Sequence, residues 1–178
     1  MSERDATHDP AVSHVSNVSR DRSAAYEALG LKDLARAGWS RAGVIHAESV
    51  AAHSWGVALL ALLRCPPGLD RGKLLAMAVL HDLAEVRVGD LTPHDGVTHE
   101  EKHARERAAM NDLLAHRPDL RALWEEAEAG TTPEARLLKA LDRADMGLQA
   151  ERYATHGHDV SEFLASAREG LTRTFTGE

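Results

Sequence analysis

"KLLAMAVLHDLAEVRVGD", residues 73–90, joins an apolar segment to a group of polar side chains. Seven of the eight residues from Lys73 to Leu80 are apolar, which predicts a helix buried in a core. His81 and Asp82 follow directly, and Glu85 lies one turn further on. Burying such groups without partners costs on the order of several kcal/mol or forces a large pKa shift. We therefore expect a salt bridge, a hydrogen-bond network or a metal ion to compensate them.

Helical patterns continue on both sides of this stretch, and strand patterns are nearly absent. Helix caps and helix-stopping Pro or Gly residues predict about six or seven helices. The main signals are Ser23, Ser49, Asp70, Thr98 with Glu101, and Thr132 with Pro133 as starts, "CPPG" (residues 65–68) and Gly130 as ends, and a last helix from about Val160 to Thr174. The third helix should run from Asp70 to near Arg87, after a loop over residues 37–48. The sequence predicts one all-α domain over residues 23–176, preceded by a disordered tail over residues 1–22.

Composition narrows the classes of function. The 178 residues suit one domain with a sizeable core, and a net charge of -7 argues against a nucleic-acid polymer or a membrane surface as partner. Cys65, the single cysteine, excludes an internal disulfide and a cysteine-rich zinc module. The opening residues lack a secretory signal, and no apolar run approaches the roughly twenty residues of a membrane span. We expect a soluble, cytoplasmic protein.

Polar residues interrupt three predicted helices at positions where the periodicity predicts core. They are His53 in "SVAAHSWGVALL", the pair His81–Asp82, and Asp142 in "LLKALDRADMGLQA". A lone histidine on an apolar face is more often a hydrogen-bonded core residue than a metal ligand. Together, however, two histidines and two carboxylates suit a divalent Mn, Fe, Co, Ni or Zn ion and fit Ca or Mg poorly. Open coordination positions on such an ion would favour metal-assisted hydrolysis.

These residues form part of a wider resemblance. His53, His81–Asp82 and Asp142 resemble the H…HD…D signature of the HD-domain metal-dependent phosphohydrolases. The segments "RAGW", "ESVAAHSWGVALLALL", "HDLAEVRVGDLTPHD", "EEKHARE" and "LDRADMGLQA" are similar to the small 5′-deoxynucleotidases of the YfbR-like group. The resemblance covers about residues 26–155. It implies a fold of six or seven helices, a homodimer, one tightly bound transition metal, and hydrolysis of nucleoside 5′-monophosphates, commonly deoxynucleotides.

The resemblance also implies roles for single residues. The metal ligands would be His53, His81, Asp82 and Asp142. Glu85 would be the catalytic carboxylate, Asp90 would contact the sugar, and Trp39 would be the tryptophan beside the nucleotide. The arginine that grips the phosphate would be Arg36, as in an "RxGW" subgroup, with Arg41 as the competing candidate. Ala52 and Asp145 depart from the pattern, because an acidic residue is common at the first position and Glu is usual at the second. Neither departure removes a proposed ligand.

The position of Glu85 in the sequence also predicts a chemical role, apart from the resemblance. One turn beyond His81, it should project near the metal without binding it directly. A partly desolvated carboxylate close to a phosphate should have a raised pKa, which suits a general acid. Glu85 could instead hold a second, loosely bound Mg ion, or lie on a solvated helix face. Asp90 could simply brace its loop.

Other interpretations stay open. Trp39 could be ordinary core or could stack on a base. His103 and His116 come after the His-Asp pair in the order that a di-iron HD-domain oxygenase or phosphodiesterase would use, although their charged surroundings favour a solvated face. A catalytically degenerate, nucleotide-sensing HD domain is a further alternative. The sequence leaves the native metal, the base preference and the choice between deoxy and ribo substrates open.

Overall fold

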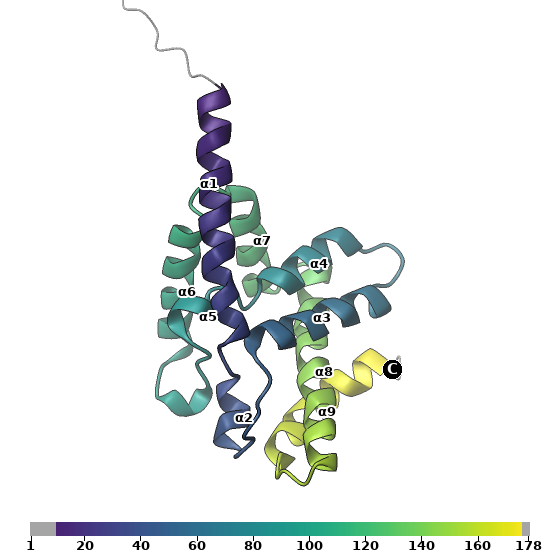
Figure 1. Ribbon diagram of the computed structural model, residues 1–178. Coiled ribbons are helices and arrows are strands. Elements are labelled where there is room, and N and C mark those ends of the chain that lie inside the picture. Colours follow the sequence, from purple (N-terminus) through teal and green to yellow (C-terminus); the bar gives the residue numbers. More distant parts are fainter. Residues whose placement is uncertain (1–9, 176–178) are drawn as a thin grey trace, which may run out of the picture.

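The computed structural model describes residues 10–175, and within them it contains nine α-helices, two short 3₁₀ helices and no β-strand (Figure 1). This confirms the all-α class, with slightly more helices than expected. In chain order the elements are α1 (Pro10–Ala28), η1 (Leu29–Lys32), α2 (Ala37–Arg41), α3 (Val50–Arg64), α4 (Arg71–Leu80), α5 (Glu85–Val88), η2 (Pro93–Asp95), α6 (His99–Leu113), α7 (Pro118–Ala129), α8 (Pro133–Thr155) and α9 (Ser161–Phe175). None of the described helices combines the length and the apolar character that crossing a membrane requires.

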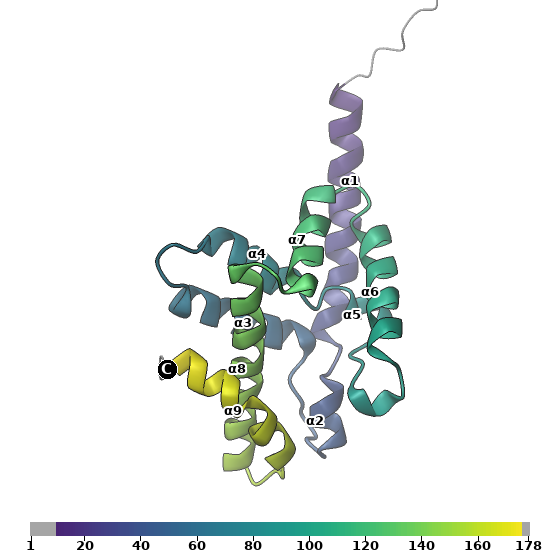
Figure 2. The ribbon, with the colours of Figure 1, turned by 180° about the vertical axis from the view of Figure 1, so that it is seen from behind.

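The long helix α8 is the centre of the packing, and it contacts α3, α4, α7 and α9 (Figure 2). The main core lies between α3, α4 and α8, where apolar side chains recur at helical spacing. Its fully buried members include Val57, Leu74, Met77 and Leu141. The polar residues discussed above therefore project from helices whose other faces are buried against one another.

Local capping signals set several helix starts. The Ser49 hydroxyl accepts a hydrogen bond from the Ala52 amide at the start of α3, and the Asp70 carboxylate accepts one from the Lys73 amide at the start of α4. Thr98 forms the expected reciprocal capping box at the start of α6. Such caps satisfy amide groups that have no partner within the helix. The predicted starts of α3, α4 and α6 are confirmed.

The predicted third helix is shorter than expected. It ends at Leu80, and residues 81–84 form tight turns before the short helix α5 begins at Glu85. Hydrogen bonds between residues three apart, such as that from the Glu85 amide to the Asp82 carbonyl, replace the helical pattern. The Trp124 indole donates to the His81 carbonyl, 3.2 Å away, and so satisfies a group that the turn leaves free. This break places His81, Asp82 and Glu85 at the end of α4 instead of along one continuous helix.

The amino-terminal prediction needs correction. Helix α1 begins at Pro10, so residues 10–22 are helical and not a disordered tail, while residues 1–9 lie outside the described part. Proline is well tolerated in the first turn of a helix. The polar composition hid the helix because ion pairs to distant residues hold it: Asp21 lies 3.0 Å from His116, and Glu27 pairs with Arg87. The short helix α2 also replaces part of the predicted loop over residues 37–48.

Candidate functional site

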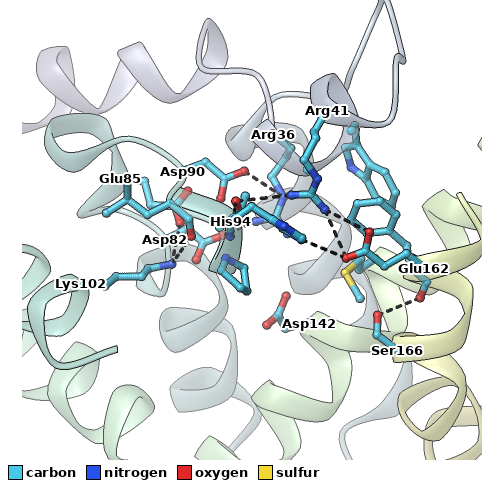
Figure 3. A pocket seen from close by; sticks show the side chains of 17 residues that line it. Arg36, Arg41, Asp82, Glu85, Asp90, His94, Lys102, Asp142, Glu162 and Ser166 are labelled. Carbon is cyan, nitrogen blue, oxygen red and sulfur yellow. Dashed lines mark hydrogen bonds and ion pairs between the residues drawn. The ribbon is translucent and has the colours of Figure 1, made fainter. Parts of the chain in front are cut away.

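A cavity of about 400 Å³ lies where α2, α8 and α9 meet the segment that follows α4 (Figure 3). Side chains from α2 and its N-cap, from residues 82–94, and from α6, α8 and α9 line it. Its volume is in the range that holds a small organic molecule. The predicted site residues Arg36, Trp39, Asp82, Glu85 and Asp142 are all among the lining residues.

Asp82 and Asp142, which line this cavity, belong to a cluster of histidines and carboxylates from α3, the turn after α4, and α8. The candidate ligand atoms of His53 on α3 and of His81 and Asp82 after α4 all lie within 4.8 Å of one another. Asp142 on α8 joins them, because its Oδ1 lies 3.0 Å from His53 Nε2. The tertiary structure thus brings together four residues that are spread over ninety positions of the sequence, as the periodicity predicts.

The two histidines present the same nitrogen to this cluster. His81 Nδ1 lies 2.9 Å from the Ala78 carbonyl oxygen, and His53 Nδ1 lies 2.8 Å from Asp145 Oδ2. If each Nδ1 carries the proton, each Nε2 keeps a free lone pair. Both Nε2 atoms are buried and have no hydrogen-bond partner among the described residues. Two unpartnered imidazole nitrogens beside two carboxylates form a donor set that fits a divalent transition metal.

The electrostatics of the cluster favour a positive charge at the same place. Burial alone would lower the pKa of His53, but the carboxylates of Asp142 and Asp145 outweigh it and raise this pKa to about 10. Burial would raise the pKa of Asp82, but the neighbouring His81 outweighs it and holds the pKa well below its usual range. These carboxylates therefore stay ionised and attract a proton or a cation.

Glu85 lies beside this cluster and is only 3% exposed. The reading as a solvated helix face is therefore wrong. Burial, together with the negative charges of Asp82 and Asp90, raises the pKa of Glu85 to about 9. Its Oε2 has no hydrogen-bond partner among the described residues, and its Oε1 lies 3.7 Å from Lys102 Nζ. A buried carboxyl group that keeps its proton at neutral pH can deliver that proton to a leaving group.

Arg36 and Asp90 connect the cluster to α2. Arg36 Nη1 lies 3.3 Å from Asp82 Oδ2, and its Nε lies 3.9 Å from Asp90 Oδ2. The same Asp90 oxygen accepts a hydrogen bond of 2.7 Å from the Ala37 amide, in the first turn of α2. Asp90 therefore contacts both the start of α2 and Arg36, in agreement with the structural role that the sequence left open for it. It also borders the cavity.

Arg41 lies elsewhere, at the rim of the cavity. Its Nη2 is 3.3 Å from Oε2 of Glu162 on α9, and its Cζ lies over the Phe163 ring, 5.9 Å from the ring centre. His94 Nε2 also approaches Glu162, at 3.3 Å. Dashed lines in Figure 3 join Arg41 and His94 to Glu162, and these three residues form the rim cluster. The structure thus separates the two arginines that the sequence left in competition.

Trp39 packs as a core residue. It is 2% exposed, its indole donates to Glu48 Oε1 at 2.9 Å, and its ring contacts those of Tyr153 and Phe163. The core reading of Trp39 is therefore correct. Because it also borders the cavity, contact with a bound base stays a prediction.

The roles of two further residues escaped the sequence reasoning, which noted Asp145 only as a departure from the family pattern. Lys102 on α6 reaches into the cavity between Glu85 and Glu106, and Asp145 holds His53 from behind. Lys102 stands among seven other charged or histidine side chains of "HEEKHARER", so residue type alone does not single it out. Asp145 did carry a signal, since it lies one turn after Asp142 and therefore projects from the same side of α8.

The two histidines of the di-iron alternative are not members of the cluster, although His103 lines a second cavity of about 210 Å³ together with His81, Asp82 and Asp142. His103 Nε2 accepts a hydrogen bond of 2.6 Å from Arg107, which has only protons to offer, and its Nδ1 lies 3.5 Å from Glu128. His103 instead groups with Glu106 and Glu128, whose candidate ligand atoms and its own all lie within 4.8 Å of one another. His116 pairs with Asp21 of α1 instead. Within residues 10–175 neither histidine groups with His53 and His81.

Comparison with known proteins links this geometry to a family. The sequence model of the HD domain matches residues 29–176. The 5′-deoxynucleotidase HDDC2 of Bos taurus is 40% identical over 69% of the chain and 62% of its own length, and 5′-deoxynucleotidase hdd1 of Schizosaccharomyces pombe is 35% identical over 75% and 73%. The chain thus spans less than two thirds of the bovine relative.

Comparison with solved structures also finds proteins of similar fold. The PH0347 protein of Pyrococcus horikoshii superposes with a TM-score of 0.76 at 30% identity, covering 87% of this chain and 94% of that one. A predicted metal-dependent phosphohydrolase from Magnetospirillum magnetotacticum gives a TM-score of 0.64 at 27% identity, with 88% and 92% covered. The likeness extends over nearly the whole described fold.

Proposed function

Because the chain belongs to the HD domain family, we propose that it hydrolyses nucleoside 5′-monophosphates, and deoxynucleotides in particular, to nucleoside and phosphate. Relatives named 5′-deoxynucleotidase support the substrate class. The observation that carries the proposal is the cluster of His53, His81, Asp82 and Asp142. Neither Nε2 atom has a hydrogen-bond partner among the described residues, and the two carboxylates line a cavity of about 400 Å³.

The proposed metal ligands are His53, His81, Asp82 and Asp142, which would hold one divalent Mn, Fe, Co, Ni or Zn ion. When bound, such an ion would neutralise charge on the phosphoryl oxygens and make an attacking water more acidic. A second, loosely bound Mg ion near Glu85 is the alternative to the acid role that is proposed for Glu85 below. The buried, ionised carboxylate of Asp82 supports a cation at this place.

Arg36 is the proposed phosphate ligand. Its guanidinium already lies beside Asp82 and offers two parallel N–H groups to phosphate oxygens. Asp90, which braces Arg36, is proposed to contact the sugar from the same loop. Trp39 and Arg41 would border the nucleoside part of the substrate, since both line the cavity on the side of α2.

Glu85 is the proposed general acid. Water attacks phosphorus, the bond from phosphorus to the 5′ oxygen breaks, and the Glu85 proton passes to that oxygen, so that the nucleoside leaves as an alcohol. The water proton then restores the carboxyl group. The burial of Glu85 supports this role, because it keeps the carboxyl protonated before the reaction.

Two copies of the chain are proposed to associate through the outer face of α3. Trp55 and Leu63 are 68% and 66% exposed there, and Val79 of the adjacent α4 is 61% exposed. Large apolar side chains gathered on one face usually mark a contact surface. Light scattering should give twice the monomer mass for the wild-type protein and the monomer mass for Trp55→Glu; a monomeric wild type would reject the homodimer.

The proposed setting is a reducing cytoplasm, with nucleoside monophosphates as partners and no nucleic-acid polymer or membrane. The free Cys65 and the net charge of -7 support this setting.

Phosphate release from a panel of ribo- and deoxynucleoside monophosphates, each assayed with Mn, Fe, Co, Ni or Zn after metal removal, tests the proposal. We expect release from at least one monophosphate that depends on an added ion. Metal analysis of the protein as purified should give close to one ion per chain. No release from any nucleotide with any metal would leave the nucleotide-sensing alternative, and two irons per chain would favour the di-iron one.

A further inference from the structure

His53 is oriented by a different kind of partner from His81. A backbone carbonyl one turn back holds His81, whereas a carboxylate from another helix, Asp145 of α8, holds His53 at 2.8 Å. His53 is completely buried, and the Asp145 side chain is 14% exposed. A hydrogen bond in such surroundings fixes both the ring plane and the nitrogen that carries the proton. Asp145 thereby determines that Nε2 is the nitrogen that points at the cluster.

Gly56 provides the space that Asp145 occupies. It lies on α3, three residues after His53, where α3 packs against α8. A Cβ atom at position 56 would stand 2.0 Å from Asp145 Oδ1 and 2.8 Å from its Cγ. The carboxylate would have to move by more than an ångström, and it would then leave His53 Nδ1. Glycine inside a helix costs about 1 kcal/mol relative to alanine, so this position gives up helix stability for room.

Glu48, the other carboxylate behind His53, is engaged elsewhere. Its side chain accepts the Trp39 indole hydrogen, and its backbone amide donates to the Tyr153 hydroxyl. Ala52, the position where an acidic residue could have supported His53, offers no polar side chain. Among the described residues, Asp145 is the side chain that is hydrogen-bonded to His53 Nδ1.

We propose that Asp145 is a positioning residue for His53, that Gly56 is required only to accommodate it, and that this pair sets the metal affinity of the site. The inference rests on the proposed metal site. It assigns to two residues of α8 and α3 the support that the family pattern would place at position 52.

A double-mutant cycle on metal affinity tests the pair without any activity measurement. Asp145→Ala, Gly56→Ala and the double variant are titrated as metal-free proteins with Co or Zn against a chromophoric chelator. We expect Asp145→Ala to weaken binding by roughly 10–100-fold, the usual effect of losing a partner of a metal-binding histidine. Gly56→Ala should weaken it comparably, and the double variant should bind no more weakly than Asp145→Ala. Asp145→Asn should recover part of the loss, because an amide oxygen still accepts the Nδ1 proton.

Gly147→Ala is the matched control. Its Cβ would crowd Ala167 and Leu171 of α9 at 2.8 Å, so it strains a helix contact of α8 away from His53. It should lower the thermal midpoint and leave metal affinity unchanged. In the Asp145→Ala background, by contrast, Gly56→Ala should raise the thermal midpoint, since the crowding is gone and alanine is the better helix former.

Additive losses from Gly56→Ala and Asp145→Ala, or wild-type affinity in Asp145→Ala, would overturn the inference. Asp82→Ala separates this from a failure of the proposed function. If Asp82→Ala loses the metal while Asp145→Ala keeps it, only the positioning role falls. If Asp82→Ala itself keeps wild-type affinity, the metal site and the inference both fall.

Discussion

Two arginine–carboxylate pairs line the same cavity at the same separation of 3.3 Å. At the inner end Arg36 faces Asp82, and both side chains are 17% exposed. At the rim Arg41 faces Glu162, and their side chains are 35% and 65% exposed. Distance therefore does not distinguish the pairs, but access to water does.

Burial changes what each pair can do. Water and salt screen the rim pair, so its charges contribute little to stability. The inner pair cannot lose one member without leaving a buried charge unpaired, and such a loss is strongly destabilising. Asp82, Asp90 and Asp142 stabilise the positive charge of Arg36, so an incoming phosphate has to compete with these carboxylates for it. The inner end therefore depends on its charge pairing much more than the rim does.

The largest effect at the inner end is expected from Asp82→Ala. It removes a proposed ligand that also contacts Arg36 and both histidines. We expect metal retention and phosphatase activity to fall to background, measured by metal analysis and phosphate release. Asp119→Ala is the control, because that carboxylate is exposed and its ion pair within residues 10–175 is with Arg117, the residue just before α7. Retained metal with normal turnover in Asp82→Ala would refute its role as a ligand.

Glu85→Gln should give the next largest effect. Glutamine keeps the shape and the hydrogen bonding of the side chain but has no proton to donate as an acid. Turnover should fall by roughly 10²–10⁴-fold, with metal content and nucleotide binding nearly intact. The exposed Glu100 of α6, changed to Gln, should keep full activity.

The leaving group sharpens this prediction. On nitrophenyl phosphate, whose leaving group needs no protonation, the loss caused by Glu85→Gln should shrink. Equal losses on both substrates would instead assign Glu85 to the attacking water or to the second, looser metal ion.

The two arginines give the direct comparison. Arg36→Ala should raise KM by roughly ten- to hundredfold, the usual worth of a hydrogen bond to a charged group. Arg41→Ala should raise it by less than about threefold, because its pair is exposed. Arg36→Lys should restore only part of the affinity, since a point charge cannot reproduce the bidentate geometry. The opposite ranking in steady-state kinetics would transfer the phosphate to Arg41.

The smallest effect is expected at the rim cluster. Glu162→Gln removes the charge that Arg41 and His94 share, at an exposed position. The thermal midpoint should move by no more than about 2 °C, and the shift should vanish at 1 M salt, where charges are screened within about 3 Å. A large shift that persists at high salt would show that the rim is as firmly built as the inner end.

The sequence by itself determined the features that depend on residues close to one another along the chain. The all-α class follows from apolar periodicity, and the starts of α3, α4 and α6 follow from Ser49, Asp70 and Thr98, each of which bonds an amide three residues ahead. The candidate ligands could also be found, because a polar residue at a core position violates the same periodicity. Local hydrogen bonds and helical spacing need no knowledge of the rest of the chain.

Only the tertiary structure decided between partners that are distant in the sequence. Arg36 reaches Asp82 across 46 positions, Asp145 reaches His53 across 92, and Arg41 reaches Glu162 across 121. The same holds for α1, whose ion-pair partners lie on α5 and beyond α6. It also holds for the turn after Leu80, in which the His81 carbonyl accepts a hydrogen bond from Trp124 of α7. A charged side chain has the same character in the sequence whether it will be solvated or buried. Its burial and its partner, which set its pKa and its role, arise only when the helices pack.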